Sequence, residues 1–196
     1  MFVKIENIKI FYETYGKGVP LILIHGHGES TYIWRYIKNG LSSSFKVYAM
    51  DLKGFGNSDK PLESDYTVRE MAKLVIDFMD KLEIREAILI CHSFGGKIGI
   101  SAIIDNPNKF KGLGLLGCAV DKFKIWRSFK ILQNRKLGKQ IIKKFNKKTV
   151  NATLKRLHDE IYDITDRDIQ EFLRIKESDG SIHAFQSYFI NFMKEN

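Results

Sequence analysis

The sequence predicts an α/β fold: a mostly parallel sheet flanked by helices, with an N-terminal antiparallel hairpin before it and a helical segment after it. Between residues 19 and 119, short apolar runs of strand length alternate with segments of helical period. These runs are apolar on both faces, which is typical of parallel strands covered by helices. After Asp121 no run has strand character. We therefore expect a core over residues 1–121 and a helical cap or lid over residues 122–196.

The elements of the expected core follow one another in order. Residues 2–15 alternate in polarity around Asn7, which predicts two strands of a hairpin. Ser30 and Thr67 are expected N-caps, the second in a capping box with Glu70, and Pro107 ends a later helix. Further strands are expected at 19–26, 45–51, 86–93 and 110–119, and helices at 30–41, 68–82, 95–106, 125–150, 151–162, 166–176 and 181–193.

Bulk composition is that of a globular protein, with 44% hydrophobic and 28% charged residues in a chain of 196. The apolar runs are too short to span a bilayer, and the N-terminus alternates like a strand, unlike a signal peptide. Cys91 and Cys118 both lie in strand-like runs, so we expect no disulfide framework and a reducing, cytoplasmic location.

Most of the net charge of +9 comes from one segment. Residues 122–156 contain thirteen Lys and Arg and no Asp or Glu, whereas residues 1–121 have a net charge of +1 and residues 157–196 of −5. Such a segment could be an amphipathic lid that touches an anionic membrane or guides acidic substrates. We favour a cap helix with an apolar face toward a pocket and a solvated basic face. No nucleic-acid partner is expected, because no recognised binding module accompanies the charge.

The stretch "AILICHSFGGKIG" (87–99) places Ser93 where a strand turns into a helix. A serine at such a turn is lifted clear of its neighbours, and the turn requires small residues two positions before and after it. Gly95 meets this requirement, while Cys91 stands where glycine is usual. Taken alone, the stretch fits a nucleophile and an ordinary Ser-Gly turn equally well.

Two further motifs favour the nucleophile. "LILIHGHGES" places His25-Gly26 at the end of an earlier strand, and "YAMDLKGFGNSDKP" places a Gly-rich turn after the strand that ends at Asp51. With Ser93, these three strand ends resemble the α/β-hydrolase superfamily. The resemblance is to its cap-bearing branch of esterases, C–C bond hydrolases, perhydrolases, epoxide hydrolases and haloalkane dehalogenases, and it covers residues 1 to about 120.

The resemblance implies roles for individual residues. Ser93 would attack an acyl carbon and form an acyl-enzyme, and the backbone N–H groups of His27 and Phe94 would stabilise the oxyanion. The substrate would be a small acyl compound, such as a carboxylic ester, and no cofactor or metal is implied. Epoxide hydrolases and haloalkane dehalogenases have aspartate at the position of Ser93, so a serine there disfavours those two activities.

The other polar residues of these motifs are expected to be structural. His25 should hold its loop by hydrogen bonds. The side chain of His92 should point in a different direction from that of Ser93. Asp51 and Ser58 should order the turn that follows the strand at 45–51.

The catalytic acid and base are not evident in the sequence. In this family they follow the nucleophile in the order acid, then histidine, but the chain ends at "YFINFMKEN" within helical sequence. We expect both to be absent, with the strand 110–119 left as a bare sheet edge. The chain would then be a truncated hydrolase, a protein completed by another polypeptide, or an inactive binding or interaction protein. Asp121, His158 and His183 are weaker candidates, and Asp121 more simply caps the next segment.

Overall fold

The computed structural model describes residues 1–118, 127–157 and 163–194. A six-stranded sheet forms its centre, in the order β1-β2-β4-β3-β5-β6. β1 and β2 form an antiparallel hairpin, β2 pairs antiparallel with β4, and β4, β3, β5 and β6 are parallel. The strands are β1 (Phe2–Ile5), β2 (Ile8–Tyr15), β3 (Val19–Ile24), β4 (Phe45–Met50), β5 (Ala87–His92) and β6 (Phe110–Leu116). The predicted fold class is confirmed.

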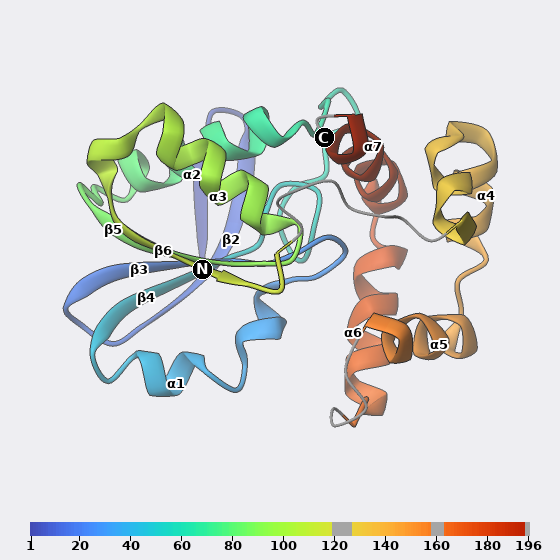
Figure 1. Ribbon diagram of the computed structural model, residues 1–196, viewed down its shortest axis with the longest axis horizontal. Helices are drawn as coiled ribbons and strands as arrows, with labels where there is room; N and C mark the ends of the chain where they lie inside the picture. Colours follow the sequence, from blue (N-terminus) through green and yellow to red (C-terminus); the bar gives the residue numbers. More distant parts are fainter. Residues whose placement is uncertain (119–126, 158–162, 195–196) are drawn as a thin grey trace.

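Helices cover both faces of the sheet (Figure 1). One face carries α2 (Val68–Lys81) and α3 (Gly95–Asp105), which is followed by the short turn η2 (Pro107–Lys109). The opposite face carries η1 (Thr31–Trp34) and α1 (Lys38–Leu41). Each layer has its own hydrophobic cluster, and Trp34 closes the smaller one against β3 and β4. The central strands β3, β4 and β5 are therefore largely buried from both sides, as their apolar runs predict, whereas β6 at the sheet edge is half-buried or exposed.

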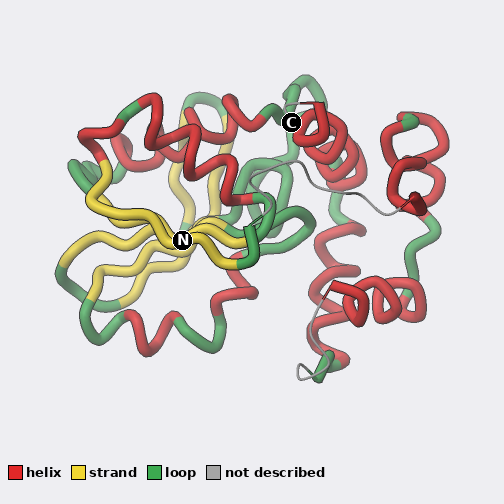
Figure 2. The backbone as a smooth tube through the Cα atoms, viewed as in Figure 1, coloured by secondary structure: helices red, strands yellow, loops and turns green. Residues whose placement is uncertain are grey.

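A group of helices follows the sheet and lies beside it (Figure 2). These are η3 (Arg127–Gln133), α4 (Arg135–Lys143), α5 (Lys147–Leu157), α6 (Asp166–Glu177) and α7 (Ser181–Lys194). α7 packs against α2, α4 and α6, and its buried aromatic side chains belong to the larger cluster of the sheet. The division of the chain near residue 121 stays a prediction, because that position is outside the described residues. No described helix is long and apolar enough to cross a bilayer.

Two expected helices are broken in the structure. The segment 30–41 forms η1 and α1, because the buried ring of Trp34 and a hydrogen bond from Thr31 N–H to the Asp51 carboxylate (2.6 Å) favour a tight turn. The segment 125–150 is interrupted at Asn134 and Asn146. Their side chains accept main-chain N–H groups two or three residues later, a local bond that competes with a continuous helix.

The expected capping box of α2 forms only in part. The Thr67 hydroxyl accepts the N–H of Glu70 at 3.1 Å, as predicted. The Glu70 carboxylate, however, accepts the N–H of Tyr66 at 2.7 Å and pairs with the buried ammonium of Lys53. Glu70 therefore fastens the loop before α2 to the helix instead of returning to the cap residue.

Candidate active site

Ser93 occupies the turn between β5 and α3, at the carboxyl edge of the sheet. Its φ angle is +51°, in the left-handed region that is uncommon for residues other than glycine. Its N–H donates to the Leu116 oxygen at 3.0 Å, and its own oxygen accepts the N–H of Gly96 at 3.1 Å. These two main-chain hydrogen bonds hold the strained backbone conformation in place, as is typical of strained turns at functional sites.

Close backbone approach explains the small residues around this turn. A Cβ at Gly95 would lie 2.6 Å from the main-chain oxygen of His25, so only glycine fits there without displacement. Cys91, which stands where glycine is usual, has room for its side chain because α3 has a glycine, Gly99, opposite its sulfur. A Cβ at Gly99 would lie 2.4 Å from the Cys91 sulfur. The space usually provided by a glycine two positions before the serine is therefore provided here by Gly99 of α3.

The imidazole of His27 is enclosed by aromatic side chains. Its Nε2 lies 2.7 Å from the main-chain oxygen of Phe185, so Nε2 carries the proton and donates it. The surrounding rings, with centroids 3.9–5.8 Å from that of His27, belong to Phe55, Phe94, Phe185, Tyr188 and Phe189. Burial lowers the pKa of His27 to about 4, so the ring is neutral at pH 7. Among the described residues nothing accepts the main-chain N–H of His27.

Phe94, the second expected oxyanion donor, is fixed by α7. Its ring stacks on that of Phe192, with centroids 3.9 Å apart and planes 6° from parallel. The Phe94 side chain is 9% exposed. The peptide after Ser93 is therefore held in place by a helix that begins almost ninety residues later.

The remaining described histidines have structural partners or lie elsewhere. His25 Nε2 accepts the N–H of Leu52 at 3.0 Å and its Nδ1 donates to the oxygen of Gly26 at 2.7 Å, which holds the loop as expected. Burial lowers the pKa of His25. His92 Nδ1 donates to Glu29 at 2.8 Å.

His183, one of the weaker candidates, packs edge-on against the Tyr66 ring, with 5.8 Å between the centroids. Its buried Nε2 has no hydrogen-bond partner in the described part of the chain. The hydroxyl of Ser93 likewise makes no hydrogen bond to any described residue. Asp121 and His158 lie outside the described residues.

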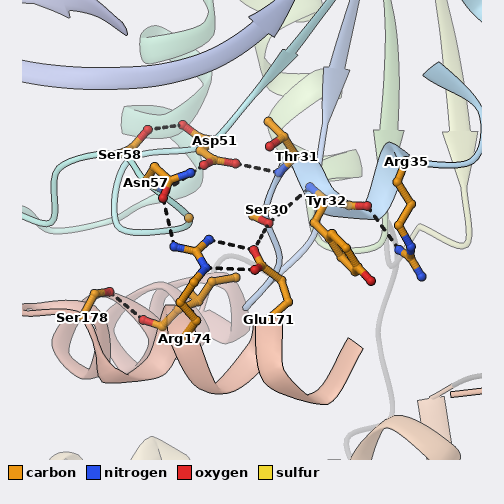
Figure 3. Close-up of polar contacts among 12 residues, drawn as sticks. Ser30, Thr31, Tyr32, Arg35, Asp51, Asn57, Ser58, Glu171, Arg174 and Ser178 are labelled. Atoms are coloured by element: carbon orange, nitrogen blue, oxygen red, sulfur yellow. Dashed lines mark hydrogen bonds and ion pairs between the residues drawn. The ribbon is translucent and has the colours of Figure 1, made fainter. Parts of the chain in front are cut away.

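Asp51 orders the loops at the same edge of the sheet (Figure 3). Its carboxylate accepts the N–H groups of Thr31 at 2.6 Å and Asn57 at 2.7 Å, and its main-chain oxygen accepts the hydroxyl of Ser58 at 2.6 Å. Burial raises the pKa of Asp51, although these bonds and nearby His25 act in the opposite direction. Asp51 and Ser58 therefore have the structural roles expected from the sequence.

α6 is joined to these loops by hydrogen bonds of its ion pair between Arg174 and Glu171 (Figure 3). The Arg174 guanidinium donates to both carboxylate oxygens of Glu171, at 2.7 and 2.9 Å, and to Asn57 Oδ1 at 2.9 Å. The hydroxyl of Ser30 donates to Glu171 at 2.9 Å. One helix of the C-terminal group thus contacts both loops that flank Asp51.

Two cavities lie where the helices meet these loops. The larger, about 70 Å³, lies between the loop at 28–35 and α5 and α6, and its walls include Ile33, Leu154 and Ile175. The smaller, about 10 Å³, also borders Gly28 and Phe172. Neither cavity is lined by Ser93. In the described ranges no group of His, Cys, Asp or Glu side chains could hold a metal ion.

Sequence reasoning missed two contributors to this site. Glu29 lies near the end of the stretch "LILIHGHGES" but was assigned no role, because its contact with His92, 63 residues later, has no local signal. The aromatic cover from α7 could have been suspected from the four aromatic residues in "HAFQSYFINF". That segment reads equally well as a core helix, so its target was not predictable.

Comparison with known proteins identifies the family. The model of a family described as alpha/beta hydrolase fold matches residues 19–156. A 2-hydroxymuconate semialdehyde hydrolase of Pseudomonas sp. (strain CF600) is 35% identical over 113 residues, which are 56% of this chain and 40% of that protein. A soluble epoxide hydrolase of Corynebacterium sp. (strain C12) is 28% identical over 206 residues, 98% of this chain and 72% of its own.

A solved structure is similar over the whole chain. The epoxide hydrolase CorEH, determined without ligand, superposes with a TM-score of 0.85 at 27% identity. The match covers 100% of this chain and 74% of that structure. The described helices after the sheet therefore share an arrangement with a known hydrolase, as the sheet does.

Proposed function

Because the chain belongs to the α/β-hydrolase fold family, we propose that it is a serine hydrolase with Ser93 as its nucleophile. The substrates would be carboxylic esters or related small acyl compounds. The observation that carries this proposal is the left-handed turn at Ser93, which projects the serine from the end of β5 just before α3 begins.

In the proposed reaction, Ser93 Oγ bonds to the acyl carbon while its proton passes to a base. The tetrahedral oxyanion would be stabilised by the N–H groups of His27 and Phe94, and losing one such donor costs about 3–4 kcal/mol of barrier. Collapse expels the alcohol, which takes up the proton, and leaves an acyl-enzyme that water hydrolyses. Serine, where epoxide hydrolases have aspartate, favours acyl over epoxide substrates.

The base is the unassigned part of this mechanism. The rings of His25 and His27 are neutral and hydrogen-bonded to main-chain groups, and His92 is paired with Glu29. Within the described ranges no side chain accepts the proton of Ser93. We therefore propose that the base and the acid come from outside the described residues, for example from another polypeptide that completes the site.

A fluorophosphonate probe tests the proposal on the full chain. We expect Ser93 to label slowly in buffer and faster when imidazole supplies a base, with no labelling in Ser93→Ala. Rapid labelling without imidazole, lost in Ser93→Ala, would show that the catalytic set is complete. Absence of labelling at any imidazole concentration would exclude Ser93 as a nucleophile.

A non-catalytic binding protein is the second candidate. It is favoured by the two cavities, which border Gly28 but are not lined by Ser93. This function predicts that small carboxylic acids raise the melting temperature equally in the natural protein and in Ser93→Ala. A shift together with absent labelling would support binding without catalysis.

The remaining partner predictions concern the basic segment 122–156. In its described part, Gly138, Ile142 and Val150 face the interior and most lysines are exposed, which supports a solvated basic face. We propose a cytoplasmic protein that binds neither nucleic acid nor membranes. Sedimentation with anionic vesicles at physiological salt, where surface charges are screened beyond about 8 Å, would reveal membrane binding.

A further inference from the structure

One carboxylate oxygen joins the two loops that meet at Ser93. Oε2 of Glu29 accepts the main-chain N–H of Gly26 at 2.7 Å and the Nδ1–H of His92 at 2.8 Å. Gly26 directly precedes His27, and His92 directly precedes Ser93. The carboxylate therefore bonds to the residue before His27 and to the residue before Ser93, which is two positions before Phe94.

The two loops also approach each other closely at Gly26, where a side chain would not fit. A Cβ at that position would lie 2.9 Å from Glu29 Oε2 and equally 2.9 Å from the Cβ of Ser93. The Glu29 carboxylate and the Ser93 side chain are thus within twice that distance of each other. A change at Glu29 would reach the N–H of His27 over one residue and the N–H of Phe94 over two.

The hydrogen bond between Glu29 and His92 favours the charged form of each side chain. Burial alone would lower the pKa of His92, but its hydrogen bond to Glu29 and the charge of Glu29 outweigh burial and raise it. Burial alone would raise the pKa of Glu29, but the bond and charge of His92 lower it. The Trp34 ring stands edge-on to His92, with centroids 6.4 Å apart, and limits its movement away from Glu29.

Other titratable groups face Glu29 without competing for its charge. His25 and His27 lie on the same loop as Glu29, and burial lowers the pKa of both rings. Of these three histidines, only His92 donates a hydrogen bond to Glu29.

We propose that Glu29 and His92 are a positioning pair, which as carboxylate and imidazolium fixes the distance between the N–H groups of His27 and Phe94. The proposal rests on the proposed function of Ser93. Neither side chain would touch the substrate or take the serine proton.

The test compares Glu29→Gln with the natural protein. Glutamine can still accept the Gly26 N–H but has no charge to hold the imidazolium. Glu70→Gln is the matched control, because Glu70 also bonds one cation, Lys53, and one main-chain N–H, that of Tyr66, away from Ser93. We expect Glu29→Gln to slow imidazole-assisted labelling of Ser93 about ten- to a hundredfold, as small misplacements do. Glu70→Gln should label at the natural rate.

A pH profile separates this role from a general loss of packing. The labelling rate of the natural protein, corrected for imidazole ionisation, should fall as the pH rises and His92 loses its proton. The labelling rate of Glu29→Gln should be low at every pH and should not change as His92 titrates. NMR of labelled histidine should show the His92 titration midpoint moving to lower pH in Glu29→Gln. An unchanged midpoint, or an unchanged rate and profile, would overturn the proposal.

Two further measurements keep the proposal testable if labelling or folding fails. Hydrogen exchange of the amides at 26–28 and 93–96 should accelerate in Glu29→Gln whether or not Ser93 reacts. A natural protein that never labels would exclude the serine function, while the exchange and titration data would still decide the role of the pair. If Glu29→Gln does not fold, His92→Asn, which retains a donor but cannot become a cation, should accelerate exchange at 26–28 and abolish the pH step; exchange as slow as in the natural protein would contradict the proposal.

Discussion

The hydroxyl of Tyr188 donates a 3.1 Å hydrogen bond to the main-chain oxygen of Phe94, ninety-four residues earlier in the chain. The Tyr188 side chain is fully buried, and its ring packs against those of Phe55 and Phe192. The bond ties α7 to the peptide that follows Ser93. The conformation of the turn therefore depends on a helix outside the sheet.

Replacing Tyr188 by phenylalanine should destabilise the protein without changing its packing. The ring would remain, but the hydrogen bond to the Phe94 oxygen would be lost, and a typical hydrogen bond contributes about 0.5–1.5 kcal/mol. Urea denaturation should show the loss as a lower midpoint with an unchanged slope. Tyr36→Phe, at a residue that is 69% exposed, serves as control. Equal stability of all three proteins would contradict the importance of the bond.

Gly95→Ala should be poorly tolerated because its Cβ would meet main-chain atoms. The new carbon would lie 2.6 Å from the His25 oxygen and 3.0 Å from that of Ile24, and overpacking of this kind costs about 1–3 kcal/mol. Gly40→Ala is the matched control, since nothing lies within 4 Å of a Cβ there. Thermal denaturation should show a lower midpoint for Gly95→Ala and no loss for Gly40→Ala.

The core of the fold could be predicted because its signals are local. The apolar runs that became β3, β4 and β5 and the helical period of α2 each specify an element without reference to distant residues. The turn at Ser93 was likewise predictable, because a serine with glycines two and three positions later stands between a strand pattern and a helix pattern.

The rest of the site could not be predicted because it depends on contacts between distant segments. Nothing near Glu29 indicates that its carboxylate pairs with His92, and nothing near His27 indicates a bond to Phe185, 158 residues later. The breaks at Asn134 and Asn146 were missed for another reason. There the helical composition of the segment outweighed a side-chain bond that forms only in the folded turn.

His27 should make the protein less stable as the pH falls. Its pKa is about 4 in the folded state and about 6.5 when unfolded, so below pH 6.5 the unfolded chain binds a proton that the folded chain does not. The free energy of unfolding should therefore decrease between pH 6.5 and 4, by at most about 1.4 kcal/mol per pH unit. Urea titrations at several pH values should show a shallower dependence in His27→Gln. A residual slope from His25, whose pKa burial also lowers, should remain.

Arg174→Lys should loosen the contact between α6 and the loop at 52–60. A lysine keeps the charge but cannot bond both Glu171 oxygens and Asn57 together, as the guanidinium does. The stability loss should be small, below about 1 kcal/mol for a partly exposed pair. Hydrogen exchange at 54–60 should nevertheless become faster. The control Arg135→Lys should leave this exchange unchanged, and identical exchange in both variants would refute the coupling.

The aromatic cover of His27 has a consequence for synthesis of the protein. Phe185, which accepts the His27 bond and packs on its ring, lies 158 residues later in the chain. At the rates at which ribosomes work, about 5–20 residues per second, the loop of His27 would emerge roughly ten to thirty seconds before Phe185. During that interval the sheet can pair while Phe94 and His27 still lack their cover. The nascent chain should therefore expose an apolar surface beside Ser93 and be a target for chaperones until α7 is made.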